Sequence, residues 1–265
     1  MALAGVILFS LACAPTEAPG ALVRPPSVLV FTKTAGFRHA AIPDAVSAIR
    51  QLGAENGFAV VATESADVFR DDVLEPHDAV LFILTTGDVL SPGQQDALTR
   101  FVRRGRGFVG VHSAADTEHG WPWYLALLGA EFRSHPDIQP ATVRVFDRVH
   151  PSTRGLPAVW ARTDEWYDFA ANPRPPGFVH VLATVDESSY AGGSMGEDHP
   201  IAWCRFYEGG RSWYTAMGHT NESWREPLFL EHLLGGIRFA AGWPDCPAED
   251  GRTRAVPPRT AVPGR

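Results

Sequence analysis

The sequence predicts an α/β fold in which helices cover both faces of a parallel sheet. From residue 27 to residue 112, apolar segments of strand length alternate with segments in which apolar residues recur at helical spacing. This alternation is typical of parallel sheets. Segment 78–84 is apolar after its first residue, as expected of a strand that is buried on both faces. A chain of 265 residues is also long enough for one large domain.

The first half of the chain shows clear element boundaries. Ser91, Pro92 and Gln94 form a helix start, in which Ser91 is the cap, Pro92 takes the first helical position and Gln94 reaches back. Gly57 and Gly105 end helices. The predicted elements are strands at 27–32, 58–63, 78–84 and 107–112 and helices at 42–52 and 91–104.

The second half is less regular and rich in proline and tryptophan. Here we predict strands at 141–146 and 178–185, a hairpin that joins 201–207 to 211–217, and a final helix at 227–240. No linker divides the chain, so one domain is expected over 27–242, and residues 243–265 are expected to form a disordered tail.

The N-terminal segment 1–26 resembles a lipoprotein signal peptide followed by a linker rich in proline and alanine. Its apolar part, 1–12, runs into Cys13 and is too short for a permanent membrane span. The segment predicts export to the cell envelope, as a periplasmic or extracellular lipoprotein anchored to the membrane through lipidated Cys13.

Net charge and cysteine content exclude some classes of partner and cofactor. The net charge of -7 argues against a nucleic-acid partner, because phosphate binding needs clustered Lys and Arg. Cys204 and Cys246 have no second cysteine nearby, so no cysteine metal or redox motif is present. In an exported protein the two could form a disulfide, or Cys204 could be a buried small apolar residue.

Two histidines follow predicted strands and point to one site. His112 comes directly after the apolar run 107–111, and His219 follows the strand-like segment 213–218. In open α/β sheets, ligands bind at the carboxyl edge of the strands. We therefore expect the two imidazoles to contribute to one site, although a lone histidine could also be a hydrogen-bonded core residue.

Other polar groups are expected at the same edge. Arg38 and His39 lie in the loop after the first strand, and Asp116 follows His112. Each has a structural alternative: Arg38 could form an ion pair, His39 could bond local backbone, and Asp116 could cap a helical turn.

The irregular half adds groups that suit a sugar, whose CH faces stack on rings and whose hydroxyls need polar partners. Any single ring could equally belong to the core. His150-Pro151 and His199-Pro200 are interpreted as turns. The candidates for sugar binding here are Trp123, His135, Gln139, Glu165 and Tyr167.

Taken together, several motifs resemble the ThuA-like, or trehalose-utilisation, family. The resemblance spans about 27–242 and includes the segments 32–39, 110–116, 121–124, 150–151, 164–167, 199–200 and 218–220. It implies a flavodoxin-like three-layer sandwich with a mostly parallel central sheet, similar to class I glutamine amidotransferases. The family is associated with sugar metabolism, particularly with keto-sugars, and its members are often exported.

The resemblance also implies a change at the sharp turn after a strand, the elbow, that carries the nucleophile in amidotransferases. In amidotransferases a cysteine at the elbow attacks the substrate and a late histidine assists it. Here the elbow position matches His112 and the late histidine matches His219, so the nucleophile is missing and glutaminase activity is rejected.

The leading hypothesis is an envelope enzyme, a hydrolase or lyase, that acts on a sugar or keto-glycoside. His39, His112 and His219 could hold a divalent metal ion. Alternatively, His112 and His219 could act as acid and base, with Asp116 or Glu165 orienting an imidazole or serving as the base. The alternatives are a non-catalytic sugar-binding protein and a partner of a sugar dehydrogenase. The expected binding residues are Arg38, His39, Trp123, His135, Gln139 and Tyr167.

Overall fold

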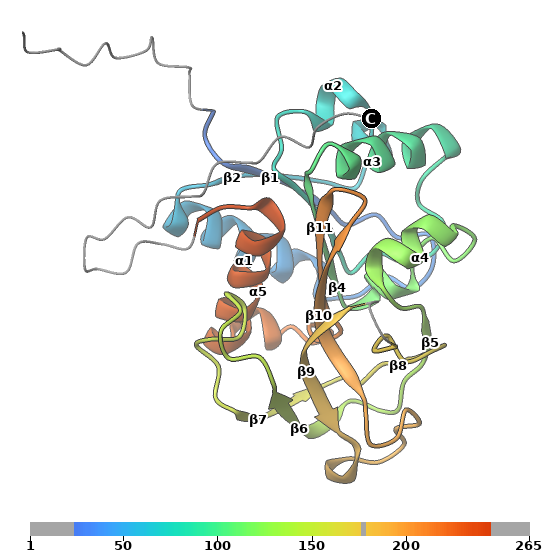
Figure 1. The fold of residues 1–265 in the computed structure, drawn as a ribbon, viewed down its shortest axis with the longest axis vertical. Coiled ribbons are helices and arrows are strands. Elements are labelled where there is room, and N and C mark those ends of the chain that lie inside the picture. The colour runs from blue at the N-terminus through green and yellow to red at the C-terminus, as the bar shows by residue number, and fades with distance from the viewer. Residues whose placement is uncertain (1–23, 176–178, 245–265) are drawn as a thin grey trace, which may run out of the picture.

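The computed structural model describes residues 24–175 and 179–244. A nine-stranded sheet with strand order β2-β1-β3-β4-β11-β10-β9-β6-β7 forms the centre of the molecule (Figure 1). Its first five strands are mutually parallel. They are β1 (Ser27–Phe31), β2 (Ala59–Thr63), β3 (Ala79–Ile83), β4 (Gly107–Val111) and β11 (Gly210–Thr215).

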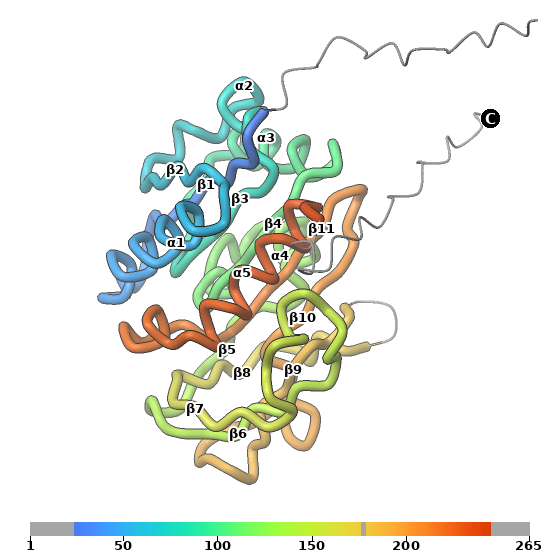
Figure 2. The backbone as a smooth tube through the Cα atoms, turned by 90° about the vertical axis from the view of Figure 1, so that its left-hand side faces the viewer, coloured from blue at the N-terminus to red at the C-terminus, as the bar shows by residue number. Residues whose placement is uncertain are grey.

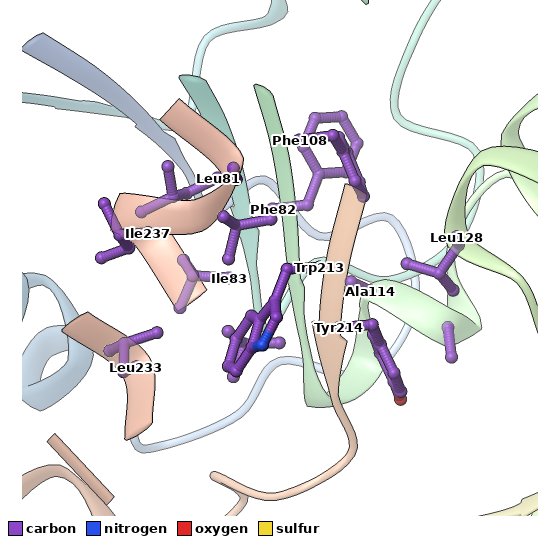
Figure 3. Close-up of a cluster of buried hydrophobic side chains, with 14 of the residues drawn as sticks. Leu81, Phe82, Ile83, Phe108, Ala114, Leu128, Trp213, Tyr214, Leu233 and Ile237 are labelled. Atoms are coloured by element: carbon purple, nitrogen blue, oxygen red, sulfur yellow. The ribbon is translucent and has the colours of Figure 1, made fainter. Parts of the chain in front are cut away.

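Helices cover both faces of this parallel part. Helices α1 (Ile42–Asn56) and α5 (Pro227–Ala241) lie on one face, and α3 (Pro92–Arg103) and α4 (Pro122–Leu128) lie on the other. The short α2 (Asp71–Leu74) packs beside α3. Figure 3 shows Leu233 and Ile237 of α5 on one side of the strands and Leu128 of α4 on the other. The fold class is therefore confirmed as a three-layer α/β sandwich.

The second half of the chain extends the sheet with antiparallel strands. These are β10 (Pro200–Tyr207), β9 (His180–Asp186), β6 (Gln139–Val145) and β7 (Val159–Asp164). β5 (Phe132–Ser134) and β8 (Asp168–Phe169) form a separate small sheet. Since direction alternates from β11 to β7, β7 runs the same way as β11, and its end faces the carboxyl edge of the parallel strands. Figure 2 shows β6, β7 and β9 together at one end of the molecule.

Several elements of the second half differ from the sequence prediction. Strand β7, helix α4 and the small sheet were not predicted. In β7, Arg162 and Asp164 occupy buried positions that an amphipathic strand normally gives to apolar residues. The predicted hairpin is confirmed, with β10 and β11 paired across Glu208 and Gly209. His199, which we interpreted as a turn residue, is fully buried at the start of β10.

The expectations for the two ends of the chain lie outside the described residues. These are the lipidation of Cys13, the predicted disordered tail beyond residue 244 and the alternative of a disulfide between Cys204 and Cys246. The predicted tail began at residue 243, but Trp243 is ordered, since its indole N–H donates to Asp78 at 3.1 Å. Cys204 itself is buried in β10. Across 24–175 and 179–244, none of the helices has the length and apolar character needed to span a bilayer.

Candidate active site

The site is built around His112, which begins the 3-10 turn η2 (His112–Asp116) directly after β4. Its backbone adopts φ +53°, a conformation that non-glycine residues rarely adopt and that is often found at functional sites. Two contacts fix it there. The Tyr214 hydroxyl donates to the His112 carbonyl at 2.8 Å, and His112 Nδ1 lies 2.7 Å from the Ala216 carbonyl oxygen. Because a carbonyl only accepts, Nδ1 carries a proton, and in the neutral imidazole Nε2 has a free lone pair.

Two further side chains contact this nitrogen, and a third lies close by. His112 Nε2 lies 3.1 Å from His219 Nδ1 and 3.2 Å from Glu165 Oε2. The distance from His219 Nδ1 to the same Glu165 oxygen is 3.0 Å. The ring of His39 lies 5.0 Å from the rings of both other histidines. One ligand atom from each of the four residues lies within 4.8 Å of the others, so the structure brings them into one cluster.

The loop that carries His219 is held by a carboxylate from the other half of the sheet. Asp164, the last residue of β7, accepts hydrogen bonds from the backbone N–H groups of Gly218 at 2.8 Å and His219 at 3.0 Å. Gly218 has φ +113°, which favours glycine. Asp164 also pairs with buried Arg162, from Nη2 to Oδ2 at 3.0 Å. We assigned no role to Asp164 from the sequence, although it directly precedes Glu165.

Burial and charge set the protonation of the cluster. Burial, together with the neighbouring His112 and His219, lowers the pKa of His39 to about 3. His39 therefore remains neutral near pH 7. Burial would raise the pKa of Glu165, but the hydrogen bonds that His112 and His219 donate when they are protonated outweigh burial and hold the pKa well below its usual range. The cluster thus presents an ionised carboxylate beside a neutral imidazole.

The accessible side of the cluster carries more rings. His135 Nδ1 lies 3.1 Å from Glu165 Oε1, and its side chain is 42% exposed. The ring of Tyr167 is buried and packs on His112 with centroids 4.1 Å apart. Phe37, which we did not identify as a site residue from the sequence, is 65% exposed. Its ring centroid lies 4.9 Å from that of His39. A signal was present, since Phe37 lies in the loop after the first strand.

Four predicted residues lie away from the cluster, namely Arg38, Asp116, Gln139 and Trp123. Arg38 forms an exposed ion pair with Glu64 at 2.7 Å. Asp116 pairs with His119 at 2.9 Å. The Gln139 side chain bonds backbone atoms of Ala191 and Asp137. The structural alternative of an ion pair therefore describes Arg38.

Trp123 lies at the other end of the central strands. Its indole Nε1 donates to Glu208 at 2.7 Å. Glu208 lies in the turn before β11, whereas His219 follows the opposite end of that strand. The length of β11 therefore separates Trp123 from the histidines.

The donor set fits a divalent transition-metal ion. Three imidazoles and a carboxylate are ligands that zinc and similar ions prefer. The hydrogen bond of His112 also matches that of a metal-binding imidazole, since Nδ1–H donates to a carbonyl while Nε2 faces the cluster. Nitrogen and oxygen lone pairs that converge at 3.0–3.2 Å need a proton or a metal ion between them.

Comparison with known proteins agrees with this architecture. The chain matches the family model ThuA, trehalose utilisation, over residues 27–240. A ThuA-like protein from Bacteroides uniformis has 23% identity and a TM-score of 0.69, covering 84% of this chain and 95% of its own. One from Parabacteroides merdae has 20% identity and a TM-score of 0.67, covering 83% and 91%.

A more distant likeness concerns the fold alone. A β-galactosidase from Bacillus circulans sp. alkalophilus has 14% identity and a TM-score of 0.53, with coverage of 82% of this chain and 31% of its own. The comparison with curated proteins found no match. Because the family model covers nearly the whole described domain, the chain belongs to the ThuA, or trehalose-utilisation, family.

Proposed function

We propose that this protein is an envelope-associated enzyme of carbohydrate metabolism that acts on a sugar or keto-glycoside at the His39–His112–Glu165–His219 cluster. Family membership suggests the role in carbohydrate metabolism. The observation that carries the catalytic part is the convergence of His112 Nε2, His219 Nδ1 and Glu165 Oε2 within 3.2 Å of one another. A packing role alone gives no reason for three such groups to meet.

In the metal-assisted version, His39, His112, His219 and Glu165 hold the ion. A bound divalent ion supplies Lewis-acid polarisation of a sugar carbonyl. The protein's own groups orient the substrate. His135 lies beside Glu165 on the accessible side, where its imidazole can bind a hydroxyl, and the exposed Phe37 ring can stack on a sugar face.

In the acid–base version, the same groups move protons. His112 Nε2 accepts a proton from the carbon next to a sugar ketone, ionised Glu165 stabilises the imidazolium that forms, and His219 or His135 donates a proton to the ketone oxygen as the enediol forms. His112 is held with Nδ1–H on the Ala216 carbonyl, so its Nε2 can pass a proton between its neighbours. The elbow carries an imidazole instead of a thiol, which leaves no acyl-enzyme route through this position.

A turnover assay tests the proposal. Wild-type protein is incubated with trehalose and with oxidised, ketone-bearing trehalose, and products are followed by mass spectrometry. We expect His112→Ala, His219→Ala and Glu165→Gln to lower turnover of the keto-sugar by about 10²–10⁴-fold. His180→Ala is the matched control, because this exposed histidine pairs with Asp147 outside the cluster.

Two outcomes favour other functions, and a third separates the two versions of the proposed one. If wild-type protein binds sugar without turnover, and His112→Ala and His219→Ala keep the affinity, the protein is a sugar-binding protein. Stable co-purification with a sugar dehydrogenase, without a ligand of its own, identifies a partner of that enzyme. A purified protein that takes up no stoichiometric metal, even after reconstitution, excludes the metal-assisted version and leaves the acid–base version to the turnover assay.

The envelope location rests on segment 1–26 alone. Labelling of full-length protein by a palmitate probe, lost in Cys13→Ala, is the expected result. An unlabelled protein in the soluble fraction contradicts this part of the proposal and leaves the catalytic part untouched.

A further inference from the structure

A second group of side chains with metal-ligand atoms contacts the segment that follows Glu165. Asp168, Glu187 and His199 each offer a ligand atom, and these atoms lie within 4.8 Å of one another. Asp168 and His199 are buried, whereas the Glu187 side chain is 17% exposed. We propose that these three residues form a second binding site for a divalent metal ion, with a structural role.

The hydrogen bonds of His199 give the first argument. Its Nε2 lies 2.8 Å from the Tyr167 carbonyl oxygen, so Nε2 must carry a proton and donate. Its Nδ1 lies 2.8 Å from Glu187 Oε1 and 3.1 Å from the Tyr190 hydroxyl. In a neutral imidazole the Nδ1 lone pair would face the lone pairs of a carboxylate. A cation must therefore bind between them, either a second proton or a metal ion.

The local charge favours the metal ion over the proton. Asp168 and Glu187 bring two carboxylates into a largely buried group, and one proton on His199 balances only one of them. The nearest other cation with an ion pair to the group is Arg133, whose side chain is 47% exposed and lies 3.9 Å from Asp168 Oδ2. Buried charges that remain unbalanced are costly. A divalent ion would balance both carboxylates.

The remaining contacts resemble the surroundings of a metal site. An imidazole that binds a metal usually donates its other N–H to a carbonyl or carboxylate, and His199 does so to Tyr167. Asp168 accepts hydrogen bonds from the Ser194 backbone at 3.1 Å and the Ser194 hydroxyl at 2.6 Å. Glu187 accepts one from the Met195 backbone at 2.7 Å. One imidazole with two carboxylates suits Mn²⁺ or Zn²⁺.

The second group is linked to the candidate site through Tyr167. The Tyr167 carbonyl oxygen contacts His199, its ring packs on His112, and Glu165 lies two residues earlier in the chain. An ion at the second group would therefore hold the segment that positions Glu165. This link rests on the proposed function, whereas the second site itself does not.

Metal stoichiometry tests the proposal. Full-length protein is stripped of metal and titrated with Mn²⁺, with free Mn²⁺ followed by electron paramagnetic resonance, and the result is checked with Zn²⁺ by elemental analysis. We expect two equivalents in wild type, one in Glu187→Gln and one in Glu165→Gln. Glu197→Gln is the matched control, because it removes the same charge from an exposed position of the same loop, and it should keep two.

The outcomes separate this proposal from the proposed function. If Glu187→Gln binds as much metal as wild type, the second site does not exist. If this variant fails to fold, the wild-type value decides, since one equivalent that is lost in Glu165→Gln overturns the second site and keeps the first. No uptake in wild type overturns both metal sites, and the turnover assay then still tests the acid–base version.

Discussion

The parallel and antiparallel halves of the sheet contribute to the candidate site in different ways. The parallel half supplies the three imidazoles, from the loops after β1, β4 and β11. All residues of β1, β3 and β4 are buried, and apolar packing holds these strands between helices. The antiparallel half supplies Asp164 and Glu165 from the end of β7, where exposed and buried residues alternate.

This difference shows how the two halves are joined. Apolar packing of the parallel strands determines the positions of His112 and His219. The buried charges of Arg162 and Asp164 determine the position of β7 relative to these histidines. Arg162 pairs with Asp164, and Asp164 binds the backbone of Gly218 and His219. The site therefore depends on apolar packing on one side and on an ion pair on the other, and each dependence can be tested separately.

The largest expected loss of stability comes from Asp164→Asn. This change leaves the Arg162 guanidinium, whose side chain is 2% exposed, with the partly exposed Glu226, 3.2 Å away, as its remaining counter-charge. Breaking a buried pair from one side typically costs about 3–5 kcal/mol. We expect the free energy of unfolding to fall by this amount in urea denaturation, and the loop of His219 to lose its anchor.

An exposed ion pair provides the control for this change. Glu64→Gln removes the partner of Arg38, and both of these side chains are about half exposed. Such pairs contribute about 0–1 kcal/mol. Equal losses in Asp164→Asn and Glu64→Gln would contradict the idea that buried charge joins the two halves.

A smaller effect is expected from Gly236→Ala, which tests packing in the parallel half. A Cβ atom at Gly236 on α5 would lie 2.4 Å from the ring of Trp213 on β11. Overpacking of this kind typically costs about 1–3 kcal/mol. Thermal or urea unfolding should show this loss.

Gly93→Ala is the matched control, because nothing lies within 4 Å of its added Cβ on α3. Alanine is the better helix former, so the free energy of unfolding should stay the same or rise by up to about 1 kcal/mol. A stable Gly236→Ala protein would mean that α5 does not pack on β11 as closely as described.

The same division explains what the sequence predicted. The parallel half follows from continuous apolar runs and caps such as Ser91 and Gln94, so its first four strands and helix α3 were predicted to within one residue at each end. Helix α4 on the same part of the sheet was not predicted. His112 and His219 were expected together because the carboxyl ends of parallel strands share an edge.

The antiparallel half was harder to predict, because its signals depend on partners that are distant in sequence. Asp164 looks like a surface residue until its contacts with Arg162 and the Gly218 loop are known. Asp116 and His112 are close in sequence, yet Asp116 pairs with His119. The aromatic residues of segment 121–124 do not indicate at which end of the central strands Trp123 lies.

The smallest expected effect on stability at neutral pH concerns His232, which lies between the two halves. The ring centroid of this buried α5 residue lies 4.8 Å from that of Trp213 on β11 and 6.5 Å from that of Trp160 on β7. Its Nδ1–H donates to the Ser152 carbonyl at 2.8 Å. Burial lowers its pKa from 6.5 to about 3. The unfolded chain therefore binds a proton that the folded protein cannot, and the stabilising contribution of the neutral imidazole, complete above pH 6.5, is lost as pH falls toward 3.

For one such group the loss is at most about 1.4 kcal/mol per pH unit. In His232→Gln the amide can still donate to Ser152 but does not titrate, so the free energy of unfolding should depend less steeply on pH between 6.5 and 4. His39 contributes equally to both proteins and cancels in the difference. If the free energy of unfolding depends equally on pH in both proteins, His232 takes up its proton in the folded state. The junction between the two halves would then hold a buried charge, which the apolar packing on its parallel side should exclude.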